Sequence, residues 1–269
     1  MTLTEWHDFD MAMAERIIAS TYGDKVSVWE NAKTLTKFGR ISGLGTAYET
    51  VWEFGGDETY VTDDVIDTVS SSDAADVGTV MFIEGHTGTG TGTGEKFRFK
   101  AQTVTLNGQS KVTLDQPIRR VSRAFVVSGT LAGDFYVYED DTLTGGVPND
   151  STKVHLTVEG ATSDHTQSFK AATTFSDSDY AILTGAYFAI TKKQAGLADF
   201  VIEVRTPGGV FRPASGRISL NSAAQNSQEI KFKPYLIVAK NSDIRVRAIG
   251  SATGIGVDAT FQCYLGKVK

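Results

Sequence analysis

Short alternations of apolar and polar residues run through most of the chain, and each one ends at turn-forming residues. The alternating runs 104–106 and 112–114 flank Asn107 and Gly108. Asn-Gly is a strong hairpin signal because both residues tolerate positive φ. Residues 243–249 alternate in the same way, with apolar side chains at every second position. This period of two predicts antiparallel β-strands rather than helices.

The strand signals form two groups, which predict a mainly β chain with two antiparallel β-sandwich domains. The first group runs from residue 58 to 150 and closes in a polar loop with Gly145, Gly146 and Pro148. The second group fills 151–269 with about eight short candidate strands between close turns, which is typical of a jelly roll. We therefore predict a first β domain at 58–150 and a jelly-roll-like second domain at 151–269.

One amphipathic helix is predicted at the N-terminus. Thr2 and Glu5 have the spacing of a capping box, and the residues from Ser20 to Gly23 supply a stop. Large apolar residues recur at helical spacing on one face: Trp6, Phe9, Met13 and Ile17. A lone helix of about 15 residues is marginal in water, so this stripe must be buried. Two alternatives stay open, packing on the chain's own β domain or docking on a neighbouring subunit or partner.

Residues 23–56 predict a connector with little regular structure. Glycines punctuate this segment, and Trp29 and Trp52 are spaced along it as anchors. Loops of this length are uncommon inside compact domains and usually extend over another surface. Helix and connector together make a predicted N-terminal arm at 1–57. Its candidate partner-binding residues are Trp6, Phe9, Met13, Ile17, Trp29 and Trp52.

Charge and composition narrow the range of partners. The net charge of −6 argues against nucleic acid, which requires a concentrated basic face. No run approaches the roughly 20 apolar residues of a membrane span, and the N-terminus lacks a secretory signal, so folding in a cytoplasm and no membrane partner are expected. Cys263 is the only cysteine, and its place in an alternating run predicts a buried, unreactive thiol.

Two groups of basic residues admit more than one interpretation. Arg119 and Arg120 lie beside a predicted strand, while Arg205, Arg212 and Arg217 lie around a Pro-Gly-Gly turn. Arginine is favoured at subunit contacts, and basic residues also protect solvated strand edges. Both interpretations stay open.

The glycine–threonine run from Gly85 to Gly94 is the most unusual feature of the first domain. A phosphate-binding loop needs Gly-Lys followed by Ser or Thr at the start of a helix. Here Glu95 separates Gly94 from Lys96, and a strand is predicted next. The run therefore predicts a mobile hairpin tip on a rigid hairpin.

No other pattern predicts catalysis, a metal or a cofactor. The four histidines are scattered, and a single cysteine cannot build a structural zinc site. The chain has no Gly-x-Ser-x-Gly nucleophile motif. Paired carboxylates for glycoside hydrolysis require positions that only the fold can bring together. We predict a protein that is not an enzyme, with a carbohydrate-active β-sandwich as a minor alternative.

Stretches of both predicted domains share a recurrent pattern of strands and turns. They are 66–76, 79–85, 103–108, 120–124, 200–205 and 208–212, and they include no catalytic residue. This pattern resembles structural proteins of tailed bacteriophages over about residues 60–265, although here the glycine–threonine run replaces a shorter turn. The resemblance implies a virion component.

Together these features predict a capsid decoration (cement) protein that is made in the host cytoplasm and located in the virion. Its expected partners are the major capsid protein and further copies of itself, as a homotrimer. The arm would bury its aromatic anchors across capsomer boundaries, since aromatic residues dominate interfaces. The alternative is a tail adaptor, fibre or receptor-binding protein. In that case Tyr180, Tyr187 and Phe188 are candidates for contact with a host saccharide.

Overall fold

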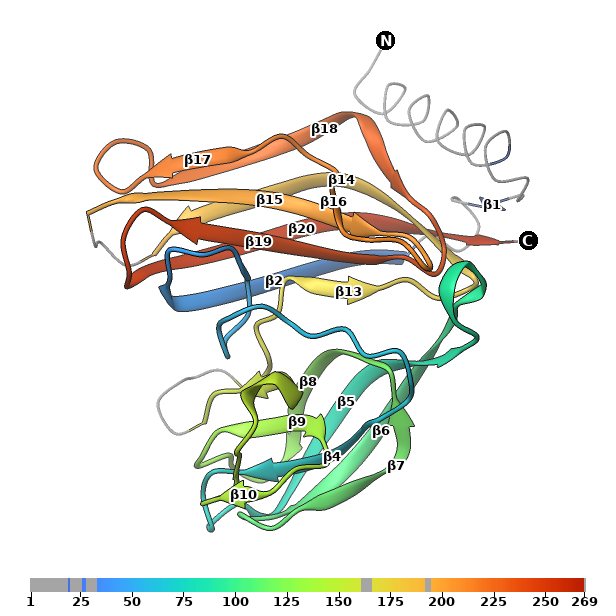
Figure 1. Ribbon diagram of the computed structural model, residues 1–269, viewed down its shortest axis with the longest axis vertical. Helices are drawn as coiled ribbons and strands as arrows, with labels where there is room; N and C mark the ends of the chain where they lie inside the picture. Colours follow the sequence, from blue (N-terminus) through green and yellow to red (C-terminus); the bar gives the residue numbers. More distant parts are fainter. Residues whose placement is uncertain (1–18, 20–25, 28–32, 161–165, 192–194, 269) are drawn as a thin grey trace.

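The computed structural model describes residues 19, 26–27, 33–160, 166–191 and 195–268, and these form two β lobes (Figure 1). The predicted N-terminal helix lies outside the described residues, as do Trp6, Phe9, Met13, Ile17 and Trp29. The fold of the described part is mainly β with several antiparallel sheets, as the alternating pattern predicts. The sheets lie in two separate lobes, one above the other in Figure 1.

The upper lobe is a sandwich of two antiparallel sheets. Within the described residues, one sheet has five strands: β1 (Val26–Ser27), β2 (Lys33–Leu44), β14 (Asp179–Ile190), β18 (Ser227–Val238) and β20 (Ile255–Val268). The facing sheet has six: β3 (Glu49–Thr50), β13 (Ala172–Thr174), β15 (Leu197–Arg205), β16 (Arg212–Pro213), β17 (Ile218–Asn221) and β19 (Asp243–Gly250). Phe188, Phe200 and Phe261 are fully buried between the two sheets.

The strand order of this lobe is that of a jelly roll. The short strands β3 and β13 both pair with β19, at adjacent positions, and together act as one strand. We number the strands in chain order: β2 is 1, β3 with β13 is 2, β14 is 3, β15 is 4, β16 with β17 is 5, β18 is 6, β19 is 7 and β20 is 8. Among the described residues, the order across the sheets is then 1-8-3-6 in one sheet and 2-7-4-5 in the other. Two Greek keys folded in this way define the jelly roll. We call this part the jelly-roll lobe.

The lower lobe is inserted into the jelly roll between β3 and β13. Within the described residues, it has a four-stranded sheet of β4 (Ile66–Ser71), β7 (Val112–Ile118), β9 (Phe135–Glu139) and β12 (Val154–Val158). Its second sheet has β5 (Val77–Thr89), β6 (Lys96–Asn107) and β8 (Arg120–Ser128), and β10 (Leu143–Thr144) pairs with β11 (Val147–Pro148). Ile83, Val137 and Leu156 lie in its own core. We call this part the inserted lobe.

The two domain boundaries predicted from the sequence do not match these pairings. β12 pairs with β9, so the predicted boundary between residues 150 and 151 falls inside the four-stranded sheet of the inserted lobe. The predicted connector at 23–56 contains β2, which pairs with β20 from Lys33 to Leu44 and lies in the jelly roll itself. The jelly roll is therefore assembled from both sides of the insertion.

A close backbone approach explains why Gly39 lies in the middle of β2. A Cβ atom at this position would meet the carbonyl oxygen of Val51 at 2.1 Å and the amide nitrogen of Ala171 at 2.4 Å. Ala171 N donates to Val51 O at 2.9 Å, so the chain enters and leaves the inserted lobe side by side at this point. Only glycine leaves room for this crossing.

The glycine–threonine run forms a hairpin whose tip contacts other parts of the chain. It continues β5 to Thr89, makes a short 3-10 turn at Gly92–Gly94 and returns along β6. Arg119 donates to Gly90 O at 3.1 Å and to Glu95 Oε1 at 3.2 Å. A Cβ on Gly208 would lie 2.4 Å from Gly92 C, so the tip contacts a turn of the jelly-roll lobe. No pattern in the sequence indicates these contacts, because the partners come from distant parts of the chain.

Candidate functional site

The junction between the two lobes gathers buried charged side chains from both of them, among the residues that the structure describes. It is formed where β8 of the inserted lobe meets β13 of the jelly-roll lobe (Figure 1). Lys37 of β2 and Asp243 of β19 also bond to residues of β8 there. Charges in a low-dielectric interior are costly unless they are paired and hydrogen-bonded. The junction therefore divides into a part where the charges are paired and a part where they are not.

Asp243 lies at the centre of the paired part and is 1% exposed. Its Oδ1 accepts from Arg120 Nε at 3.1 Å and from Thr174 Oγ1 at 2.6 Å, and its Oδ2 accepts from Arg205 Nε at 2.9 Å. Burial acts to raise the pKa of this carboxyl, but the guanidinium groups of Arg120 and Arg205 outweigh it and hold the pKa below its usual range. We call these four residues the Asp243 cluster. The cluster joins the lobes because Arg120 comes from the inserted lobe and the others from the jelly roll.

Two aromatic rings extend the Asp243 cluster toward a second carboxylate. Tyr60 and Phe211 meet edge to face, with ring centroids 4.8 Å apart. The guanidinium of Arg245 lies 3.9 Å from the Phe211 centroid and donates from Nε to Glu203 Oε2 at 2.9 Å. Arg205 lies 4.8 Å from the Tyr60 centroid. Stacked, paired guanidinium groups of this kind stabilise an interface more than isolated lysines do.

A buried ion pair lies beneath the crossing point of the chain. Lys170 is 3% exposed and donates to Glu58, and also to the carbonyl oxygens of Val121 and His155, each at 2.9 Å. Its ammonium lies 5.6 Å from the ring centroid of Trp52. Every strong polar contact of Lys170 is therefore made inside this chain.

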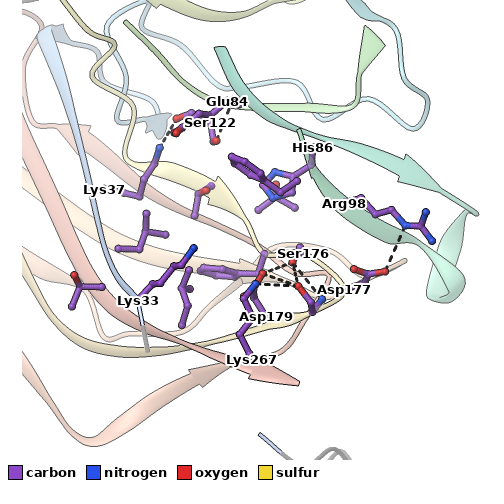
Figure 2. A pocket seen from close by; sticks show the side chains of 18 residues that line it. Lys33, Lys37, Glu84, His86, Arg98, Ser122, Ser176, Asp177, Asp179 and Lys267 are labelled. Atoms are coloured by element: carbon purple, nitrogen blue, oxygen red, sulfur yellow. Dashed lines mark hydrogen bonds and ion pairs between the residues drawn. The ribbon is translucent and has the colours of Figure 1, made fainter. Parts of the chain in front are cut away.

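The unpaired part of the junction is a cavity of about 390 Å³, which we call the inter-lobe cavity (Figure 2). β2 supplies Lys33 and Lys37, the inserted lobe supplies Glu84, His86, Arg98 and Phe99, and the segment 173–179 and Lys267 complete the wall. Volumes of this size are typical of small-molecule sites.

Lys37 is a buried cation on this wall without a buried counter-ion. It is 7% exposed, and its ammonium donates to the carbonyl oxygen of Ser122. Among the described residues, no carboxylate lies within ion-pair distance of it. Burial, together with the charge of Lys170, lowers the pKa of Lys37 to about 7. The Lys37 amine therefore loses its proton at a lower pH than an exposed lysine does.

His86 contributes a second unsatisfied nitrogen to the same cavity. The side chain is 5% exposed, and its buried Nδ1 has no hydrogen-bond partner among the described residues. Burial lowers the pKa of His86 to about 4, so the ring is neutral at physiological pH. Its ring meets Phe99 edge to face at 5.7 Å, and Phe99 is 55% exposed.

Two of the three carboxylates that line the cavity, those of Asp179 and Asp177, have cationic partners, whereas Glu84 has no ion pair among the described residues. Asp179 pairs with Lys267 at 2.5 Å and accepts from Ser176. Asp177 lies 3.9 Å from Arg98. Figure 2 shows these contacts on the side of the cavity opposite Lys37. Asp179 and Asp177 are thus paired, whereas Lys37 and Glu84 form no ion pair and affect each other only through the longer-range interaction of their charges.

The structure places the candidate residues from the sequence in different environments. Trp52, the one candidate anchor among the described residues, is 2% exposed, and its Nε1 donates to Gly56 O at 3.1 Å. Its ring is buried by this chain, so burial of Trp52 needs no partner. The other five candidates lie outside the described residues, and their role stays a prediction.

The structure also shows the environment of the predicted saccharide contacts, of the cysteine and of the arginine pair. Tyr180 and Phe188 are 1% and 0% exposed, so these two saccharide candidates are wrong, and only Tyr187 is exposed, at 44%. Cys263 is buried, and burial raises the pKa of its thiol to about 12, as predicted for an unreactive cysteine. Arg120 does lie at an interface, but one within the chain, where it pairs with Asp243, whereas Arg119 pairs with Glu95 inside the inserted lobe. Lys37, His86 and Asp243 carried no sequence signal as site residues.

In the part of the chain that the structure describes, no group of three or more His, Cys, Asp or Glu side chains is arranged to hold a metal ion. No helix there is long and apolar enough to cross a membrane.

Comparison with known proteins gives only weak structural similarities. No protein-family model matches the chain, and no curated protein matches it in sequence. Among solved structures, the chain is similar to the infectious bursal disease virus VP2 subviral particle, with 12% identity over 94% of this chain and 77% of that one, at a TM-score of 0.24. The Gt strain structure of the same virus matches with 10% identity over 94% and 82%, at 0.20.

A third similarity is to an enzyme, the Arthrobacter globiformis T6 isomalto-dextranase complexed with panose. It has 10% identity and covers 87% of this chain but 34% of the enzyme, at a TM-score of 0.23. TM-scores of this size do not show a shared fold. The jelly-roll assignment rests on strand order alone.

Proposed function

We propose that this chain is a virion structural protein of a tailed bacteriophage, and specifically a capsid decoration protein. The observation that carries the proposal is the jelly-roll strand order with a second β lobe inserted into it. Jelly rolls form the framework of viral capsid domains and of lectins. Paired charges at the lobe junction join the two lobes, which suits a protein that acts by presenting fixed surfaces rather than by chemistry.

The position of β1, which follows the N-terminal segment in sequence, supports a contact of that segment with the capsid. β1 pairs with the end of β20, with Val26 opposite Val268. The strand that follows residues 1–25 in sequence therefore lies at one end of β20. Their sequence carries the apolar stripe of Trp6, Phe9, Met13 and Ile17. Burial of that stripe on the major capsid protein would contribute about 25 cal/mol per Å² before the costs of association.

The test is decoration of phage heads by stripe variants of the full chain. Trp6→Ser combined with Phe9→Ser should abolish cosedimentation with heads that lack the protein, because the apolar anchor is lost. Asp8→Ser combined with Asp10→Ser is the matched control, since it changes the polar positions of the same segment. A deletion of residues 1–44 would not serve, because it removes β2 from the jelly roll.

Decoration at full occupancy by the Trp6 and Phe9 variant would overturn the proposed role of this segment. Copy number distinguishes the second candidate, a tail adaptor, fibre or receptor-binding protein. Quantitative gel analysis of purified particles should give hundreds of copies for a decoration protein and at most a few dozen for a tail part. We propose self-association as a homotrimer and no enzymatic activity.

A further inference from the structure

We propose that the inter-lobe cavity binds an acidic sugar, a uronic acid or similar carboxylated monosaccharide unit of a glycan. This goes beyond a structural role in the virion and does not depend on it. Lys37 and His86 form one wall of the cavity and Phe99 lies exposed beside them. The carboxylate of such a sugar would bind at Lys37, and its ring would pack against Phe99.

The carboxylate fits the wall formed by Lys37. Among the described residues, the one hydrogen-bond partner of its ammonium is Ser122 O, although an ammonium has three donors. A buried cation left in this state is costly, and an anion from the ligand would supply the missing partner. Lys33, exposed on the same strand, adds a second positive charge to the cavity.

Two of the three acids that line the cavity have partners. Asp179 is held by Lys267 and Ser176, and Asp177 faces Arg98. The third acid, Glu84, has no ion pair among the described residues, and its charge acts on Lys37. Four basic side chains line the cavity against these three acids: Lys33, Lys37, Arg98 and Lys267. This excess of basic groups favours an anion.

The exposed ring and the hydroxyls distinguish a sugar from a simple anion. Phe99 offers an exposed aromatic face or edge next to His86, and the C–H faces of a pyranose are apolar enough to pack against it. Thr173, Ser176 and Ser178 add hydroxyl groups to the wall. Inorganic phosphate would use the cations alone. The cavity of about 390 Å³ is near the lower end of small-molecule sites, which suits one sugar unit.

Binding should depend on pH through Lys37. The charges that act on its ammonium are the cations Lys170 and Arg123 and the carboxylates Glu84 and Glu58, and burial has the largest effect. Because the pKa of the unliganded lysine is about 7, a carboxylate ligand must keep or add the proton. Affinity should therefore be highest below pH 7 and decline as the pH rises above it.

The experiment is a calorimetric titration of the full chain with D-glucuronate, D-glucose, acetate and inorganic phosphate at pH 6 and pH 8.5. We expect glucuronate to bind at least roughly tenfold more tightly than each of the other three, since each lacks one recognised feature. We also expect its affinity to fall at the higher pH. The pH comparison uses the unchanged protein, so it needs no folded variant.

Two substitutions assign the binding to the cavity. Lys37→Met should weaken glucuronate binding by about tenfold or more, and Phe99→Ala should weaken glucuronate but not acetate. Lys231→Met and Val210→Ala are matched controls, because these side chains are exposed elsewhere, at 71% and 67%. They should leave the affinity unchanged.

Three results would overturn the proposal: no glucuronate binding at millimolar concentration, glucose or phosphate binding as tightly as glucuronate, or unchanged affinity in Lys37→Met. Equal binding of phosphate and glucuronate would indicate an anion site without sugar recognition. This titration uses isolated protein, whereas decoration is measured on phage heads. Failure of one therefore leaves the other standing.

Discussion

The two parts of the lobe junction contain similar residue types in opposite states. In the Asp243 cluster, each oxygen of a buried carboxylate accepts from a guanidinium, and Thr174 supplies a further donor. In the inter-lobe cavity, an equally buried lysine donates to one carbonyl oxygen, and a buried histidine nitrogen has no partner among the described residues. The difference shows that burial of a charged side chain does not by itself reveal what that side chain does. Buried charges that are paired hold the lobes together, whereas buried polar groups without a full set of partners are available to a ligand.

The largest effect is expected from breaking the completed pairs. Asp243→Ala leaves the Arg120 and Arg205 guanidinium groups buried without their carboxylate, which should lower the free energy of unfolding by about 3–5 kcal/mol. Urea denaturation followed by tryptophan fluorescence measures this change. Because the pKa of Asp243 is lowered in the folded state, its contribution is present at neutral pH and is lost as the pH falls below about 4.

An exposed ion pair of the same lobe is the matched control for Asp243→Ala. Arg217 lies 3.3 Å from Asp199, but its side chain is 60% exposed. Arg217→Ala should change stability by at most about 1 kcal/mol. Equal losses in the two variants would contradict the view that the buried network holds the junction.

A smaller and pH-dependent effect is expected at His86. Its folded-state pKa is about 4, below the ordinary value of 6.5. As the pH falls from 6.5 toward 4, the unfolded chain takes up this proton before the folded chain does, so stability declines. The decline attributable to His86 is on the order of 2–3 kcal/mol.

Denaturation of the unchanged protein and of His86→Phe at pH 7, 5.5 and 4.5 measures the His86 effect. The two curves should diverge with falling pH, with the variant declining less. Parallel curves would show that His86 gains its proton at an ordinary pKa and that its nitrogen is not isolated in the fold.

The sequence predicts a strand well where every second residue is apolar and faces the core. The hairpin at Asn107 and Gly108 is confirmed, with Gly108 at a φ of 57° between β6 and β7. β2 was missed for a physical reason. Its inward positions are Leu35, Lys37, Gly39 and Ile41. A lysine at the cavity and a glycine at the chain crossing break the apolar period there.

The candidate site could not be predicted from sequence for a related reason. Lys37 and Asp243 lie near opposite ends of the chain, and His86 and Arg120 belong to the inserted lobe. Only the insertion between β3 and β13 brings them to one junction. The doublet Arg119-Arg120 was the single available signal, and it indicated an interface without indicating that both sides belong to one chain.

The most direct test of this account measures stability and glucuronate affinity on the same two variants. Lys37→Met should lose binding while unfolding at the same or a higher urea concentration than the unchanged protein, because an apolar side chain removes the cost of a buried charge. Asp243→Ala should lose stability by several kcal/mol. If Lys37→Met is destabilised as strongly as Asp243→Ala, Lys37 is part of what holds the lobes together, and the division of the junction into a paired and an unpaired part is wrong.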